Sequence, residues 1–212
     1  TGGSLGIAVR MNAYDSVPYP YGWGVDREDF HRPDYREPAR LAEILTGLGV
    51  SLFNVTCGNP YYNPHVNRPF DAGAYRPPFH PLEGVATLLG AARAIQTAAT
   101  GAAVMATGFS WLRQWGPYVA AAAIEQGWFA LAGFGRLSFA YPDFARDVMN
   151  LGRLDPAKVC LACSKCTVMM RDGGTAGCVL RDSATYAPLY RAGREGKPAA
   201  ESVQLAENVL GR

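Results

Sequence analysis

Four of the five cysteines lie together in the stretch CLACSKCTVMMRDGGTAGC, residues 160–178. Cys160, Cys163, Cys166 and Cys178 have the spacing C-x2-C-x2-C-x11-C. Three closely spaced thiolates and one distant thiolate suit a [4Fe-4S] cluster, because one compact loop can reach three of its corners. Structural zinc sites usually have two separated pairs of ligands, so the spacing favours iron–sulfur over zinc. A disulfide framework is disfavoured, because the chain lacks a secretion signal and adjacent C-x2-C cysteines are poorly placed to staple a large core.

The segment that leads back to Cys178, RDGGTAG at residues 171–177, is rich in glycine. This composition predicts a flexible return that lets the fourth ligand reach the other three. Cys57 stands apart from the cluster at the end of a predicted strand, where we expect a buried core thiol.

Segments with strand and helix patterns alternate over the first 150 residues. Apolar runs predict strands at 5–13, 50–56, 101–108 and 127–136, and helical spacing predicts helices at 36–48, 83–98, 116–126 and 141–150. Gly49 is expected to end the first of these helices. Four strand-then-helix units indicate a parallel sheet with helical crossovers, which is an α/β fold.

Two α/β architectures fit this alternation, a doubly wound open sheet and a (β/α)8 barrel. The string GFGRLS resembles a dinucleotide fingerprint, but it follows the last strand and has Ser138 where the third glycine belongs. Two consecutive strands end in glycine, within VMATGFS and LAGFGR. In a barrel these ends would be neighbours that cradle a phosphate, with Arg136 pairing to it. The alternative is that both are ordinary strand-ending turns.

Composition describes a globular chain of 212 residues, with 49% hydrophobic residues and a net charge of +2. This charge balance gives no reason to expect a nucleic-acid or membrane-surface partner. The longest apolar stretch, at 119–132, is interrupted by Glu125, Gln126 and Gly127, so no membrane span is predicted. The N-terminal sequence does not read as a secretory signal, and a cytoplasmic location is expected.

The strings AVRMNAYD, GVSLFNVTCG, AVMATGFS and FALAGFGRLSFAYPDFARDV occur in order before the cysteines. Together they resemble the flavin-dependent barrel oxidoreductases of the old yellow enzyme class, and more closely the iron–sulfur branch that includes 2,4-dienoyl-CoA reductase and trimethylamine dehydrogenase. Those relatives usually have one more residue between the second and third cysteines. The resemblance covers residues 5–190, and its strands match the fifth to eighth of the barrel.

This resemblance implies an α/β fold of the (β/α)8 TIM-barrel type, of which the chain has about the last four units. Residues 1–150 would form the C-terminal half of the barrel, and 151–190 an iron–sulfur segment. Residues 191–212 would form a tail with a terminal helix.

Arg10 is a charge within the first predicted strand, and a buried arginine needs a partner. The resemblance places it beside the flavin pyrimidine ring, where a cation stabilises negative charge on the reduced flavin. A salt bridge from Arg10 to Asp15 or to a neighbouring strand is the alternative.

Further site residues also follow from the resemblance. Gly108, Phe109, Gly135 and Arg136 match the cradle for the FMN phosphate. Asn54, Tyr61, Tyr62 and His65 would border the substrate pocket. A lone histidine in a loop, however, is more often a surface residue than a proton donor.

The implied activity is that of an FMN-dependent NAD(P)H oxidoreductase that reduces an activated C=C bond in an enone or enoyl thioester, with the [4Fe-4S] cluster relaying electrons. The chain alone is expected to be incomplete for this activity, because the family's flavin-edge groups and principal proton donors from the first four strands are not in this sequence. Besides a small-molecule substrate, the expected partner is an N-terminal half-barrel or a second copy of the chain, because a four-strand half-barrel has two open edges. The other function class is a non-enzymatic metal-binding subunit, for electron transfer or interaction, that retains the half-barrel fold.

Overall fold

Four parallel strands form one sheet, in the order β1-β2-β3-β4, in the computed structural model of the chain, which describes residues 5–71, 73 and 75–196. The strands are β1 (Ile7–Asn12), β2 (Val50–Thr56), β3 (Ala103–Ala106) and β4 (Leu131–Ala132). Arg10 lies opposite Asn54, which lies opposite Met105 in the next strand. The predicted parallel α/β sheet is therefore confirmed.

Helices connect these strands and continue after the last of them. The connections contain α1 (Arg36–Gly47), α2 (Pro64–Asn67), α3 (Pro81–Ala98), the 3-10 helix η1 (Phe109–Trp115) and α4 (Gly116–Glu125). After β4 come α5 (Gly135–Ala140), α6 (Phe144–Leu151), α7 (Lys165–Arg171) and α8 (Ser183–Arg194). Among the described residues, no helix is both long enough and apolar enough to cross a membrane. The predicted terminal helix lies outside the described residues.

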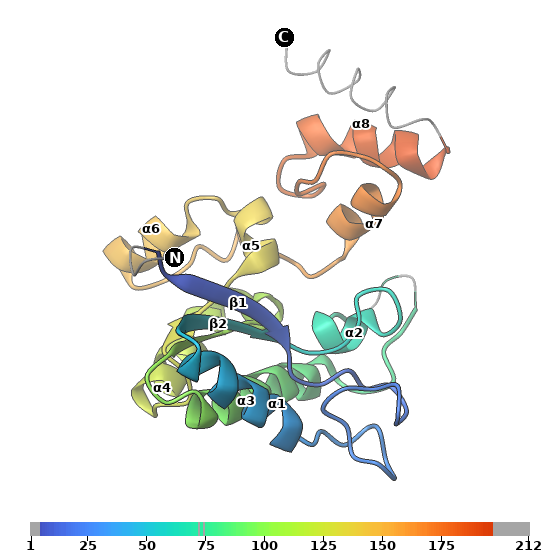
Figure 1. The fold of residues 1–212 in the computed structure, drawn as a ribbon. Coiled ribbons are helices and arrows are strands. Elements are labelled where there is room, and N and C mark those ends of the chain that lie inside the picture. Colours follow the sequence, from blue (N-terminus) through green and yellow to red (C-terminus); the bar gives the residue numbers. More distant parts are fainter. Residues whose placement is uncertain (1–4, 72, 74, 197–212) are drawn as a thin grey trace.

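The sequential strand order places the crossover helices on one face of the sheet. Each strand is added beside the previous one in the same direction, and right-handed crossovers then all pass over the same side. Figure 1 shows α1, α3 and α4 together on that side of the strands. A doubly wound sheet reverses its strand order at a switch point, which this sheet does not. The fold is compatible with part of an α/β barrel.

The main core lies between the sheet and these helices. Phe53, Val55 and Val104 project from the strands with at most 1% of their surface exposed. Leu88 and Ile95 of α3 pack against them and are also fully buried. Each such side chain contributes about 1.5–3 kcal/mol by its removal from water, so this layer holds the strands in register.

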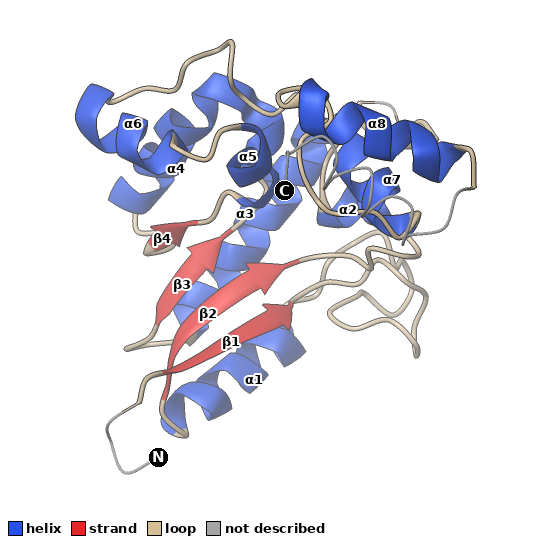
Figure 2. Ribbon diagram, turned by 90° about the horizontal axis from the view of Figure 1, so that it is seen from above, coloured by secondary structure: helices blue, strands red, loops and turns tan. Residues whose placement is uncertain are grey.

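The opposite face of the sheet is largely uncovered. The pairing places Ala8, Arg10, Leu52, Met105 and Leu131 on this face, and each is exposed or half-exposed. Figure 2 looks onto the face, and no helix of the described part of the chain lies across the strands. Parallel sheets are ordinarily covered on both faces. Here the described residues cover one.

The fourth strand is much shorter than predicted. Residues 127–136 were expected to form it, but only Leu131–Ala132 pair with β3, and α5 begins at Gly135. The apolar pattern has another cause at Phe129, which is buried against Phe109 in the core.

The end of α1 follows the prediction. Leu48 caps the helix, and Gly49 comes next with a φ of +98°.

Candidate functional site

A cavity of about 520 Å³ lies at the carboxyl ends of the strands. Its lining includes Arg10, Gly108, Gly135 and Arg136, which are four of the five residues predicted to bind FMN. They come from β1, the turn after β3 and the start of α5, so the sheet brings together positions up to 126 residues apart in the sequence (136 − 10 = 126). We call this space the anion cavity.

Among the described residues, three arginines and no acidic residue line the anion cavity. They are Arg10, Arg136 and Arg68, which follows α2. Nε of Arg68 and Nη1 of Arg136 are buried without a hydrogen-bond partner, whereas Nη2 of Arg136 donates to the carbonyl of Pro69 at 3.0 Å. Partial burial lowers the pKa of both guanidinium groups, and the charge of Arg136 lowers the pKa of Arg68 further. Unpaired buried donors of this kind fit a phosphate group.

The two glycines of the cavity have different surroundings, close packing at Gly108 and free space at Gly135. Gly108 has a φ of +109°, and a Cβ atom there would lie 2.7 Å from Cδ1 of Leu88. A Cβ atom at Gly135 would meet nothing within 4 Å, so its main chain borders free space. The predicted phosphate cradle therefore has room beside the main chain and cations next to it.

Arg10 is exposed, not buried as predicted, because its face of the sheet is uncovered. Its Nη1 donates to Oδ1 of Asn54 at 2.8 Å. The alternative of a salt bridge to Asp15 is wrong, since the Asp15 carboxylate accepts from the side chain of Asn12 and from the backbone N–H of Trp23. Arg10 also lines a neighbouring cavity of about 370 Å³ with Asp15, so the two cavities meet at this arginine.

Five of the residues predicted to bind FMN or to border the substrate pocket are not part of the anion-cavity lining. Asn54 is one of them, and it reaches the cavity only through its hydrogen bond from Arg10. Phe109 is fully buried in the core, so only its backbone could reach a ligand. Tyr61 and Tyr62 are 87% and 68% exposed. His65 lies on α2, half-buried, with Nδ1 2.7 Å from the hydroxyl of Tyr75, and burial lowers its pKa. The predicted substrate-pocket residues are therefore not gathered at this cavity.

Sequence reasoning missed Asn67 and Arg68, which both line the anion cavity. Asn67 donates from Nδ2 to Oγ1 of Thr56 at 2.9 Å and to the carbonyl of Cys57 at 3.0 Å. These bonds tie the end of α2 to the end of β2 and so hold Arg68 at the cavity. The available signal was an Asn-Arg pair in the long connection after a strand end, where parallel sheets place their binding residues.

The four clustered cysteines line one small cavity of about 20 Å³, which we call the cysteine cavity; they are Cys160, Cys163, Cys166 and Cys178. All five cysteines are free. Among the described residues, no group of three or more Cys, His, Asp and Glu side chains is arranged to hold a metal ion. Cys57 is the buried core thiol that was predicted, and burial raises its pKa.

The backbone of the cysteine loop is strained at two positions that flank Cys163. Ala162 has a φ of 52° and Ser164 a φ of 60°, which are rare values for residues other than glycine. The backbone N–H of Ala162 points to Sγ of Cys160 at 3.4 Å, and Oγ of Ser164 is buried without a partner. Strain of about 1–3 kcal/mol per residue concentrates at functional sites. An N–H directed at sulfur and a free buried hydroxyl fit an anionic, sulfur-rich group.

The glycines before Cys178 are closely packed, which differs from the flexible return that was predicted. A Cβ atom at Gly174 would lie 3.0 Å from Cγ of Met169. At Gly177, a Cβ atom would lie 2.1 Å from Cζ of Tyr186, a ring on α8. Glycine is required here by contact with the helices, and this contact fixes the position of Cys178.

We expect Gly177→Ala to destabilise the segment around α7 and α8 by about 1–3 kcal/mol, because the added methyl group overlaps the Tyr186 ring and forces it to move. The measurement is the free energy of unfolding in urea. Gly47→Ala is the matched control, since a Cβ atom there meets nothing within 4 Å and alanine is favoured in a helix. Equal stability of the two variants would contradict the assigned role of Gly177.

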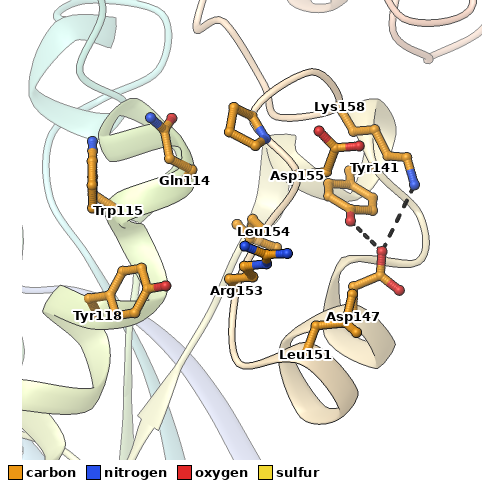
Figure 3. A pocket seen from close by; sticks show the side chains of 11 residues that line it. Gln114, Trp115, Tyr118, Tyr141, Asp147, Leu151, Arg153, Leu154, Asp155 and Lys158 are labelled. Atoms are coloured by element: carbon orange, nitrogen blue, oxygen red, sulfur yellow. Dashed lines mark hydrogen bonds and ion pairs between the residues drawn. The ribbon is translucent and has the colours of Figure 1, made fainter.

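A further cavity, of about 500 Å³, lies between α4 and the segment around α6 and is drawn in Figure 3. Trp115 and Tyr118 form one side, and Asp147 lies on the other. The Asp147 carboxylate accepts a hydrogen bond from the hydroxyl of Tyr141, and Nζ of Lys158 lies 3.9 Å from it. None of the predicted site residues lines it.

The anion cavity and the cysteine cavity are adjacent. Arg136, Phe139 and Cys166 line both of them. A phosphate-bearing ligand and a sulfur-ligated metal centre could therefore lie side by side at the carboxyl ends of the strands.

Compared with known proteins, the chain matches no family model, no curated protein and no solved structure.

Proposed function

We propose that this chain is the C-terminal half of an FMN-dependent NAD(P)H oxidoreductase of the old yellow enzyme class, with a [4Fe-4S] cluster on its cysteines. One observation carries the proposal. A single cavity gathers Arg10, Gly108, Gly135 and Arg136, and it shares a wall with the cavity that the four cysteines line. Its buried, unpaired arginine donors support a phosphate ligand.

FMN, when bound, supplies hydride acceptance from NAD(P)H and the release of single electrons. Arg136 and Arg68 would hold its phosphate with their free buried donors. Arg10, oriented by Asn54, would hold positive charge beside the ring system. The four cysteines would hold the cluster, which supplies one-electron transfer. The activated C=C bond of an enone or enoyl thioester would be reduced at this end of the sheet.

The uncovered face of the sheet supports the proposal that the fold is completed by further strands. We propose that an N-terminal half-barrel or a second copy of the chain pairs with the edge strands β1 and β4, covers this face and closes an eight-strand barrel. In a barrel the inward-facing side chains of all strands meet in a packed interior. Leu52, Met105 and Leu131 would form this chain's share of that interior.

FMN binding tests the anion cavity directly. Titration of the iron-and-sulfide-reconstituted chain with FMN is expected to quench flavin fluorescence saturably. Arg68→Met and Arg136→Met should each weaken binding roughly 10- to 100-fold, because a charge-assisted hydrogen bond contributes about 1.5–3 kcal/mol. Arg153→Met is the matched control, since this exposed arginine lines the cavity of Figure 3 instead.

The same sample separates the two function classes. Iron–sulfur absorption together with FMN binding supports the oxidoreductase. Iron–sulfur absorption without FMN binding supports the alternative, a non-enzymatic electron-transfer or interaction subunit, which the positions of Tyr61 and Tyr62 away from the cavity favour. Bound zinc without acid-labile sulfide would contradict the iron–sulfur assignment in both classes.

A further inference from the structure

Arg136 occupies a position that the phosphate assignment alone does not require. It lines both the anion cavity and the cysteine cavity, together with Phe139 and Cys166. Its Nη2 is held by the carbonyl of Pro69 at 3.0 Å, while Nη1 is buried and unpaired. A single positive charge is therefore fixed in the wall between two sites that are both expected to carry negative charge.

We propose that Arg136 is a shared counter-ion that couples the two cavities, so that an anion bound in one lowers the affinity of the other for added negative charge. This inference rests on the proposed function, because it requires a phosphate in the anion cavity and a cluster on the cysteines. It goes further, since it assigns Arg136 a role in setting the reduction potential of the cluster.

The sign of the coupling follows from charge. Reduction adds one electron to the cluster, and a nearby cation stabilises this added negative charge. A phosphate dianion beside Arg136 offsets that cation, so the reduction potential should fall when the anion cavity fills. Linkage is reciprocal, and phosphate should therefore bind more weakly to the reduced protein by the same factor.

Burial makes the effect large enough to measure. The unpaired nitrogen of Arg136 is shielded from water, so its interactions are screened less than those of surface charges. Coupling between sites typically changes affinity about 5- to 150-fold. We expect at least a fivefold difference between the phosphate dissociation constants of the oxidised and reduced forms.

Arg181 provides the matched control. It lines the cysteine cavity but not the anion cavity, and both its Nε and Nη2 donate to the carbonyl of Val159 at 3.1 and 2.9 Å. Removal of its charge should lower the reduction potential without changing the response to phosphate. Removal of the Arg136 charge should abolish the response.

The experiment is an electrochemical titration of the reconstituted chain, in Tris buffer, at increasing inorganic phosphate and constant ionic strength. The wild-type potential should fall until phosphate saturates its site. Arg136→Met should show no such fall even at phosphate concentrations that saturate the variant by calorimetry, Arg136→Lys should retain it in part, and Arg181→Met should retain it in full. Circular dichroism of each variant checks that it is folded, and the comparison of the wild-type chain with Arg136→Lys and Arg181→Met decides the question if Arg136→Met does not fold.

The outcomes distinguish failure of the proposed function from failure of the coupling through Arg136. Absence of a cluster, or of phosphate binding by calorimetry, would overturn the proposed function and this inference with it. A cluster and bound phosphate with a potential independent of phosphate would overturn the coupling alone. An equal loss of the response in Arg181→Met would show that Arg136 is not the shared counter-ion.

Discussion

Replacement of Cys178 by serine is expected to reduce the iron content of the reconstituted chain from about four atoms to less than one. Cys178 is the remote ligand, and it lines the same cavity as the three cysteines of the loop. Serine preserves the size of the side chain but is a poor ligand for an iron–sulfur cluster, whose irons bind thiolate. The measurements are iron and acid-labile sulfide per chain after anaerobic reconstitution.

Cys57→Ala is the control for this experiment. Cys57 is also a free thiol, but it is buried in the main core and does not line the cysteine cavity. Its loss should lower stability modestly and leave the iron and sulfide content unchanged. A Cys178→Ser chain with full iron content would show that the cluster has another fourth ligand. A wild-type chain that binds zinc and no sulfide would favour the other metal centre that the spacing permits.

The sheet could be predicted from sequence where its strands are long. Residues 50–56 were expected to form a strand and do so, because Phe53 and Val55 alternate with the side chains of the uncovered face. The length of the fourth strand was overestimated because the apolar residues at 127–136 have two different roles. Leu131 and Ala132 pair with β3, whereas Phe129 fills the core from a loop. Hydrophobicity alone does not distinguish these roles.

The candidate site could be predicted in part. Gly108, Gly135 and Arg136 follow consecutive strands, and parallel strands bring their carboxyl ends together, so their meeting follows from topology. Arg68 was missed because its place depends on the hydrogen bonds of Asn67 to the end of β2, which no local pattern records. The burial of Arg10 was predicted wrongly because the inference assumed that both faces of the sheet were covered.

Arg10 is therefore exposed for the same reason that Ala8 is exposed and Leu52 half-exposed, because no described element covers their face of the sheet. Arg10 and Asn54 lie at the cavity end of the face, and Ala8, Leu52 and Leu131 continue it as an apolar surface. A polar end beside the ligand cavity and an apolar remainder is the pattern of a barrel interior below its active site. Covering the apolar part would also desolvate Arg10 and strengthen its interaction with an anionic ligand.

Introduction of a charge on this face should prevent its association with a partner. Leu131 is 42% exposed on β4, so Leu131→Glu should fold normally in the isolated chain. An unpaired carboxylate buried at an interface costs several kcal/mol, which corresponds to a roughly hundredfold or greater rise in the dissociation constant. We expect the wild-type chain to associate in solution and Leu131→Glu to be monomeric, as measured by size-exclusion chromatography with light scattering.

Ile44→Glu is the matched control, because Ile44 is 47% exposed and lies on α1, on the helix-covered side of the sheet. It introduces the same charge at similar exposure, so its association should equal that of the wild-type chain. Equal dissociation of both variants would point to general repulsion between charged chains. A well-folded wild-type monomer would contradict self-association. It would also show that the edges of the sheet are stable without a partner, and this would remove the physical reason for proposing that further strands complete the fold.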